Sequence, residues 1–251
     1  FFNMIILSIL FFITAILYSS VGFGGGSTYL ALFLIWGVPY HIFPIIALLC
    51  NIIVVSNNSF NYIRAGNYNF KFLLPFIAGS IPFAFIGGSL TINKDLFEIL
   101  LFLVLSFAGL LLLINNKSYE EKEIKINRLN NFISFLIGAI LGLASGTIGI
   151  GGGIFLSPIL FLLKAEHPRV IVTSASLFIL INSISGILGQ LTKEMMLNQI
   201  LSYWTLFLSV LIGGLVGNYL NLKIFSNRTL AVITSILVIF VATRIGYKIF
   251  I

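Results

Sequence analysis

The stretch GFGGG at residues 22–26 is repeated almost unchanged as GIGGG at residues 149–153, 127 positions further along the chain. Each cluster interrupts a long apolar segment, although glycine weakens a helix by about 1 kcal/mol per residue relative to alanine. A helix-breaking cluster that occurs once in each half of a chain indicates an internal repeat. The two clusters therefore predict two similar halves, each beginning with a hydrophobic segment that breaks at its glycines.

The composition of the 251-residue chain is that of a membrane protein. Hydrophobic residues make up 59% of it, charged residues make up 8%, and the mean hydropathy is +1.12. Soluble domains carry roughly 25% charged residues. We therefore predict an all-α polytopic protein of a cell inner (plasma) membrane. The single cysteine, Cys50, excludes an internal disulfide and a multi-cysteine metal site.

Apolar runs divide the chain into two halves joined by one charged stretch. Each half holds one long glycine-broken segment and three runs of ordinary spanning length, about 20 residues. The runs lie at 1–36, 42–60, 70–91 and 96–115 in the first half, and at 132–164, 168–191, 200–221 and 229–251 in the second. This pattern predicts a first transmembrane repeat over 1–115, a charged cytoplasmic linker over 116–131 and a second transmembrane repeat over 132–251.

The length of the glycine-broken segments predicts that each is a helical hairpin. The two arms of the second segment would form roughly 24 and 16 Å of helix at 1.5 Å per residue. Together they are too long for one pass of a hydrocarbon core about 30 Å thick. A hairpin that enters and leaves from one side, with the glycines at its buried tip, fits better. Each half then crosses the membrane three times, and the two structural repeats are inverted.

The distribution of basic residues favours the same topology. With hairpins, the linker side collects ten of the 14 Lys and Arg residues: Arg64, Lys71, Lys117, Lys122, Lys125, Arg128, Lys164, Arg169, Lys223 and Arg228. If each long segment crosses once, the split is nine against five and the repeats are parallel. The positive-inside rule prefers the more uneven split. We therefore interpret the net charge of +7 as orienting the chain in the membrane, with no nucleic-acid partner.

The glycine tips are candidates for binding a small anion. Freed N–H groups before the short helix that follows each cluster would lie at the positive end of its dipole, and successive glycines can form an anion-holding nest. Inverted repeats place two such tips near the bilayer midplane, where secondary transporters bind their substrates. The predicted substrate-binding residues here are Ser20, Gly24, Gly25, Gly26, Ser27, Thr28, Ser145, Thr147, Gly151, Gly152 and Gly153. The alternative is that the glycines only permit close helix packing.

Polar residues in the second run of each half are predicted to line the same cavity. They are Asn51, Asn57 and Asn58 in the first half, and Thr173, Ser174, Ser176, Asn182 and Ser183 in the second. Asn51 and Asn58 are seven residues apart and share a helix face. Of the amides, Asn57, Asn58 and Asn182 are the ones we favour. The alternative for each is an interhelical hydrogen bond.

Two histidines stand at equivalent places, just before the second run of each half. His41 and His167 would titrate near neutral pH, so the pair suggests proton coupling, with ordinary interfacial loop histidines as the alternative. The coupling ion is therefore left open between H⁺ and Na⁺. No cofactor and no metal site is predicted, and the oligomeric state is not indicated by the sequence.

Nearly the whole chain, from about residue 5 to 248, resembles the TauE/SafE sulfite exporter family. The resemblance rests on the two glycine-cluster hairpins, on NYIRAGNYNF (61–70) after the second run, and on the small-residue third runs. Members of this family move sulfite, sulfoacetate and other sulfonates or small organosulfur anions across the inner membranes of bacteria and archaea. The resemblance therefore implies this class of substrate.

The leading interpretation is a secondary transporter, and more specifically an exporter, of small sulfur-containing anions. It would work by alternating access around a midplane anion site. An anion channel and a non-transporting membrane scaffold are the alternatives. An intramembrane enzyme is disfavoured, because the sequence lacks an HExxH motif and its only aspartate, Asp95, stands at the edge of a run.

Overall fold

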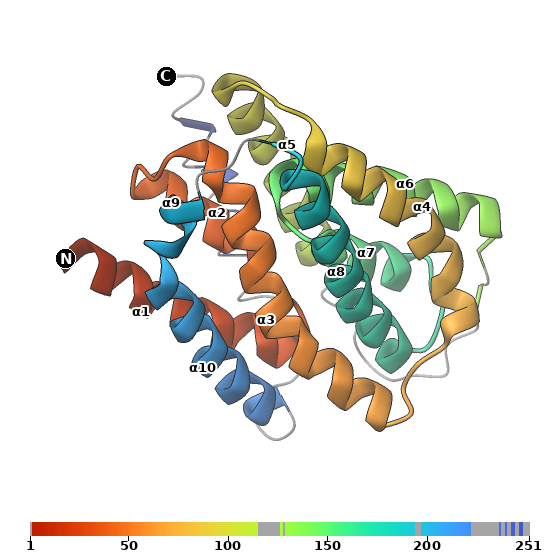
Figure 1. Ribbon diagram of the computed structural model, residues 1–251. Coiled ribbons are helices and arrows are strands. Elements are labelled where there is room, and N and C mark those ends of the chain that lie inside the picture. The colour runs from red at the N-terminus through yellow and green to blue at the C-terminus, as the bar shows by residue number, and fades with distance from the viewer. Residues whose placement is uncertain are drawn as a thin grey trace.

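The computed structural model describes residues 2–114, 126–127, 129–193 and 197–221, together with 236, 239, 242, 243, 246 and 247. Every regular element among these residues is a helix (Figure 1). Most of the predicted linker (116–131) and of the last apolar run (229–251) lies outside the described residues. The all-α prediction is confirmed for the part of the chain that the structure describes.

The helices of the two halves correspond in order and length. The first half contains α1 (Phe2–Val21), α2 (Gly26–Ile35), the 3-10 turn η1 (Tyr40–Ile42), α3 (Phe43–Arg64), α4 (Phe70–Ser89) and α5 (Lys94–Ile114). The second half contains α6 (Asn131–Ile148), α7 (Gly153–Leu162), α8 (Pro168–Gln190), the short α9 (Leu197–Leu201) and α10 (Trp204–Asn221). The counterparts are therefore α1 and α6, α2 and α7, α3 and α8, and α4 and α10.

Local sequence signals set several helix starts. The side chains of Asn69 and Asn130 cap α4 and α6, accepting hydrogen bonds from the N–H groups of Phe72 at 3.2 Å and Phe132 at 2.9 Å. Prolines stand in the first turns of α3 and α8, where a missing N–H costs nothing. The prolines therefore mark the starts of α3 and α8, the long helices that follow the two hairpins.

Both glycine-broken segments fold back on themselves. In the first, the Phe11 and Phe33 ring centroids are 5.1 Å apart, and the Tyr18 hydroxyl lies 2.7 Å from that of Thr28. In the second, the N–H of Asn127, just before α6, donates to the carbonyl of Lys164, just after α7, at 3.0 Å. Each segment therefore enters and leaves on one side, with its glycines at the far end.

The third-run helices pack against the hairpin of the opposite half. Helix α4 lies along α6, and α10 lies along α1, on opposite flanks of the molecule (Figure 1). A Cβ added to Gly142 would lie 2.5 Å from the Ser80 carbonyl, and one added to Gly213 would lie 2.5 Å from the Phe12 carbonyl. Glycine at these positions lets the helix backbones touch, as is common between helices in membranes.

Helices α3 and α8 run antiparallel between the two flanks (Figure 1). The hydroxyls of Ser59 and Ser176 are 3.0 Å apart, while a Cβ on Gly186 would lie 3.1 Å from a Leu48 methyl group. The end of α3 therefore faces the first half of α8, and the first half of α3 faces the end of α8. The counterpart helices α3 and α8 therefore pack side by side at the centre in opposite directions.

The outer surface of the helices is apolar. The described residues contain five helices long and apolar enough to cross a membrane, and α2, α7 and α10 are shorter apolar helices. Large hydrophobic side chains point away from the core, among them Ile140, Phe132 and Leu74, each about two-thirds exposed. Apolar side chains exposed on this scale fit contact with lipid rather than water. The protein is a multi-pass membrane protein.

We expect Gly217→Ala to destabilise the protein by about 1–3 kcal/mol, because its methyl group would overlap the Ile16 carbonyl and force α10 off α1. Gly214→Ala, on the same helix, is the matched control. Its methyl group would lie at an ordinary 3.5 Å from Val54, so alanine should be neutral or gain up to about 1 kcal/mol of helix stability. Thermal unfolding of the purified protein in one detergent measures both, and equal effects would contradict the proposed contact.

Candidate functional site

The two tips share one backbone design. Gly25 and Gly152 hold equivalent places as the N-caps of α2 and α7, with φ of +87° and +75°. An L side chain in this left-handed region costs roughly 1–2 kcal/mol, so glycine is required there. Gly22 and Gly149, which open the clusters, also have positive φ. The clusters are thus turns that end one helix and start the next.

Several N–H groups at each tip have no partner among the described residues. The N-cap residue of each short helix is a glycine and therefore provides no side-chain cap. Among the hydrogen bonds of the described residues, none uses the N–H of Gly24, Gly25, Gly26, Ser27, Gly151, Gly152 or Ile154. Unpaired buried N–H groups are rare, and at a helix start they attract negative charge. This arrangement fits the predicted use of the glycines.

Asn51, on α3, joins the two tips. Its amide nitrogen donates to the Ile150 carbonyl at 3.1 Å, within the second cluster. On its other side, a Cβ on Gly24 would overlap the Asn51 carbonyl oxygen. The tips also meet directly, since a Cβ on Gly26 would lie 2.8 Å from the same Ile150 carbonyl. The structure therefore brings the two glycine clusters into one place, with Asn51 between them.

The predicted hydroxyls at the tips divide into bonded and unbonded groups. Ser27 and Thr28 both bond to the Tyr18 hydroxyl, at 3.1 and 2.7 Å. Ser20 donates to the carbonyl of Leu17 and Thr147 to that of Leu143, each within its own helix. Ser145 is buried, and its hydroxyl has no partner among the described residues. Tyr18, which holds the first tip, was not singled out by the sequence.

The three favoured amides differ in their surroundings. Asn58 uses both amide atoms on Ser19: its nitrogen donates to the Ser19 carbonyl at 3.0 Å, and its oxygen accepts from the Ser19 hydroxyl at 3.1 Å. Asn57 is half-buried. Asn182 is fully buried, and neither of its amide atoms has a partner among the described residues. Of the three, Asn182 has the most unused hydrogen-bonding capacity.

A matching contact occurs in the second half. Gln190, on α8, donates from its side-chain nitrogen to the Gly146 carbonyl at 2.9 Å. Ser19 and Gly146 each stand three residues before the first glycine of their cluster. An amide of α3 or α8 thus satisfies the carbonyl at the end of the hairpin arm in each half, which fixes both tips to the central helix pair.

Buried polar atoms without partners gather at the level of the tips on three helices. Among the described residues they include the Asn51 oxygen, the Ser145 and Ser183 hydroxyls and the Asn182 amide. Ser145 accepts through its carbonyl from the N–H of Gly149, at the tip itself. Gly186, one turn after Asn182 and Ser183, lies against Gly146, since a Cβ added to it would be 3.3 Å from the Gly146 Cα. Buried polar groups normally have partners, so these unpaired atoms are available to bond to a polar ligand or to water.

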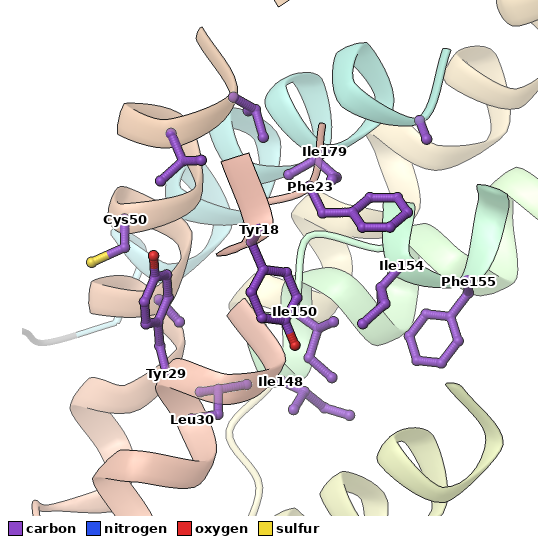
Figure 2. Close-up of a cluster of buried hydrophobic side chains, with 14 of the residues drawn as sticks. Tyr18, Phe23, Tyr29, Leu30, Cys50, Ile148, Ile150, Ile154, Phe155 and Ile179 are labelled. Atoms are coloured by element: carbon purple, nitrogen blue, oxygen red, sulfur yellow. The ribbon is translucent and has the colours of Figure 1, made fainter. Parts of the chain in front are cut away.

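Apolar side chains surround the tips. Figure 2 shows Phe23 of the first cluster and Ile150 of the second within one group of buried hydrophobic side chains, with Ile154 and Ile179 beside them. Phe23 and Ile150 are at most 4% exposed. The low dielectric of such surroundings strengthens the interaction of N–H dipoles with a bound charge.

The described residues contain no group of three or more His, Cys, Asp and Glu side chains that could hold a metal ion. His41, in η1 just before α3, donates from Nε2 to the side-chain oxygen of Gln199 at 3.1 Å, on the side away from the linker. The backbone N–H of His167 donates to its neighbour Glu166 on the linker side. Among the described residues neither histidine bonds to a glycine tip, and the two lie at opposite ends of the antiparallel pair α3 and α8.

Comparison with known families agrees with this architecture. A family model described as sulfite exporter TauE/SafE matches residues 7–245, nearly the whole chain. The chain belongs to the TauE/SafE family. The resemblance seen in the glycine clusters is thereby confirmed.

Relatives of the TauE/SafE chain carry transporter names. The "Probable membrane transporter protein y4hK" of Sinorhizobium fredii is 28% identical over 233 residues, which cover 92% of this chain and 93% of the relative. The "Probable membrane transporter protein MJ0441" of Methanocaldococcus jannaschii is 30% identical over 204 residues, covering 75% and 73%. The "Probable membrane transporter protein YdhB" of Bacillus subtilis is 25% identical over 217 residues, covering 84% and 86%. No solved structure is detectably similar.

We expect Asn51→Ala to lower the stability of the protein without ligand by about 1–3 kcal/mol, because it leaves the buried Ile150 carbonyl without its donor. Asn57→Ala is the matched control six residues further along α3, where the side chain is half-buried and the expected change is within about 0.5 kcal/mol. Thermal unfolding of both variants checks this, and a neutral Asn51→Ala would show that the tips do not depend on the bridge.

Proposed function

We propose that the protein is a secondary transporter, working as an exporter, of small sulfur-containing anions such as sulfite, sulfoacetate or other sulfonates. The observation that supports it most is the meeting of two helix N-termini whose glycine N–H groups are unbonded, with Asn51 between them. Two such ends focus partial positive charge on one point. The family name and the transporter names of the relatives support the substrate class.

Backbone dipoles suit the binding of an anion that must also be released. A Lys or Arg at the bilayer midplane costs about 2.5 kcal/mol or more on insertion scales. Among the described cations, Arg64 stands at the end of α3 and Lys193 just beyond the end of α8, rather than at the tips. A site built from N–H groups, with the Asn182 amide and the Ser145 hydroxyl beside it, provides attraction without a permanent charge.

Inverted repeats with alternating access account for the arrangement of the helices. The contact of Asn69 with Glu166, at 2.8 Å, joins the end of α3 to the end of the second hairpin. In a parallel arrangement these two ends would lie on opposite sides of the membrane. Each half also covers the hairpin of the other, so that a rocking motion of one half would expose the tips to one side at a time.

The closed surroundings of the tips favour a transporter over the alternative, an anion channel. A channel needs a continuous polar path, whereas Phe23 and Ile150 bury the tips among apolar side chains (Figure 2). In an inner membrane, export of an anion is favoured by about 2.3 kcal/mol per charge per 100 mV. Export therefore needs no coupling ion, although H⁺ or Na⁺ could accompany the anion.

We expect a substrate anion to raise the melting temperature of the detergent-purified protein. Sulfite, thiosulfate, sulfoacetate, isethionate, taurine and chloride would be compared. A ligand at 100 times its Kd adds about 2.7 kcal/mol to the free energy of unfolding. The shift should become smaller when Gly25→Ala and Gly152→Ala are combined, because the added side chains distort both nests.

Gly37→Ala is the control for this pair of substitutions. Gly37 also has a positive φ, of +66°, but nothing lies within 4 Å of its added Cβ, and it is outside the tips. The control should lose some stability and keep the anion-dependent shift. If the folded double variant keeps the whole shift, the anion does not bind at the tips. If no sulfur anion shifts any variant, the substrate class is wrong.

The inverted topology predicts which loops share a side. Lys71→Cys and Lys164→Cys should react with a membrane-impermeant maleimide from one side, the cytoplasmic one, and Asp95→Cys from the other. All three positions are exposed, and the native Cys50 is fully buried, so wild type gives the background. Sealed vesicles of both orientations provide the measurement. Labelling of Lys71→Cys and Lys164→Cys from opposite sides would mean single crossings and parallel repeats.

A further inference from the structure

A cavity of about 140 Å³ lies on the side of the protein away from the linker. The ends of α6 and α8 form part of its wall, with the segment before α3 and the loop before α5. Its described polar lining consists of Tyr40, His41, Thr91, Thr147, Gln190 and Lys193. A water molecule's share of the liquid is about 30 Å³. The cavity therefore has room for a small anion and some of its water.

The floor of this cavity is the outer surface of the second glycine tip. Pro44 lines the cavity, and a Cβ on Gly149 would lie 2.5 Å from the Pro44 Cα. Thr147, also in the lining, stands two residues before Gly149. Gln190 links the cavity to Gly146 through its hydrogen bond to that carbonyl. A ligand in the cavity is thus separated from the tips by a single layer of residues.

Lys193 gives the cavity a positive charge. Its ammonium group donates to the Gln190 side-chain oxygen at 3.0 Å, which occupies one of its three donors. Burial lowers the pKa of Lys193, because desolvation disfavours its charged form. Within the described part of the chain no carboxylate pairs with it, and the ion pair found nearby joins Lys94 to Glu98 at 4.0 Å. A bound anion would offset the desolvation of the ammonium.

The rest of the described lining is compatible with an anion. It contains no acidic side chain. His41 already donates one bond from Nε2 to the Gln199 side-chain oxygen, and Thr91 and Tyr40 carry hydroxyl groups that can donate. One fixed charge, flanked by neutral donors, is the pattern expected for a small oxyanion.

The cavity on the linker side offers a contrast. It is larger, about 330 Å³, and its lining contains both Lys71 and Glu166. The Glu166 carboxylate accepts from the Asn69 amide at 2.8 Å and from the His167 N–H at 2.9 Å. A carboxylate in the wall repels anions and offsets the lysine. The excess of positive charge is therefore a property of the first cavity.

We propose that the cavity around Lys193 is a second binding site, specific for small oxyanions, and that it is the vestibule through which the substrate passes on the side away from the linker. The proposal that an anion binds there is supported by the cavity and by Lys193, and does not depend on the transport function. The vestibule role rests on the transport function proposed above. Lys193 holds the anion next to the second tip, and Gln190 connects the ammonium to the hairpin arm that carries this tip.

Protection of a cysteine in the cavity wall tests the binding site. Thr91→Cys places a thiol in the lining while keeping Lys193, and the buried Cys50 contributes little background. Sulfoacetate at about ten times its Kd should slow labelling by a maleimide about tenfold. The protection should disappear when Lys193→Gln is added and should persist with Lys193→Arg. Glu194→Gln, which changes the charge of the next residue in the sequence, should leave protection intact or strengthen it.

The same assay separates this site from the glycine tips. Protection should remain in the combined Gly25→Ala and Gly152→Ala variant, because the cavity does not include those residues. No protection by sulfoacetate or sulfate, or protection that survives Lys193→Gln, would overturn the proposal. Protection without any anion flux in proteoliposomes would keep the binding site and refute the transport function.

Flux measurements test the vestibule role. In proteoliposomes of known orientation, Lys193→Gln should raise the KM for sulfite added on the cavity side about tenfold. The KM from the linker side and the maximal rate should change less than twofold. An equal rise from both sides, or no rise from the cavity side, would show that the substrate does not pass Lys193.

Discussion

Backbone N–H and carbonyl groups cannot be left facing lipid, and this constraint shapes the whole structure. Helices α1 and α6 both stop at glycines in the middle of the apolar region, so both breaks must be buried in protein. The fold buries them against each other and against α3 and α8. Asn51 and Gln190 then satisfy carbonyls at or near the breaks, but the N–H groups stay unbonded. The donors that remain are the ones that an anion could use.

Glycine has two separate roles in this chain, and the two were alternatives on sequence grounds. At Gly25 and Gly152 a positive φ makes glycine necessary for the turn itself. At Gly142 and Gly213 the backbone is helical, and glycine is needed because a neighbouring helix backbone occupies the space of a side chain. Close packing accounts for the glycines on the flanks. At the tips, Gly24, Gly26 and Gly153 are closely packed as well, so the use of the tip N–H groups for an anion stays a proposal.

Much of the architecture could be predicted because it depends on patterns along the chain: two halves with glycine-tipped hairpins follow from hydropathy and spacing. The partners of individual polar side chains could not. Asn51 and Asn58 share a helix face, yet one reaches the tips and the other is bonded to Ser19, because depth along α3 decides what each meets. Tyr18 and Gln190 carried no signal, since their roles exist only once distant helices are packed.

The exchange of helices between the halves has a consequence for how the protein is made. As the first half leaves the ribosome, α4 presents a surface shaped for α6, and α1 presents one shaped for α10, which is the last helix of the part that the structure describes. Neither surface can be covered until the second half has entered the bilayer. Neither repeat can therefore bury these surfaces alone, and the native packing forms only when both halves are in the bilayer.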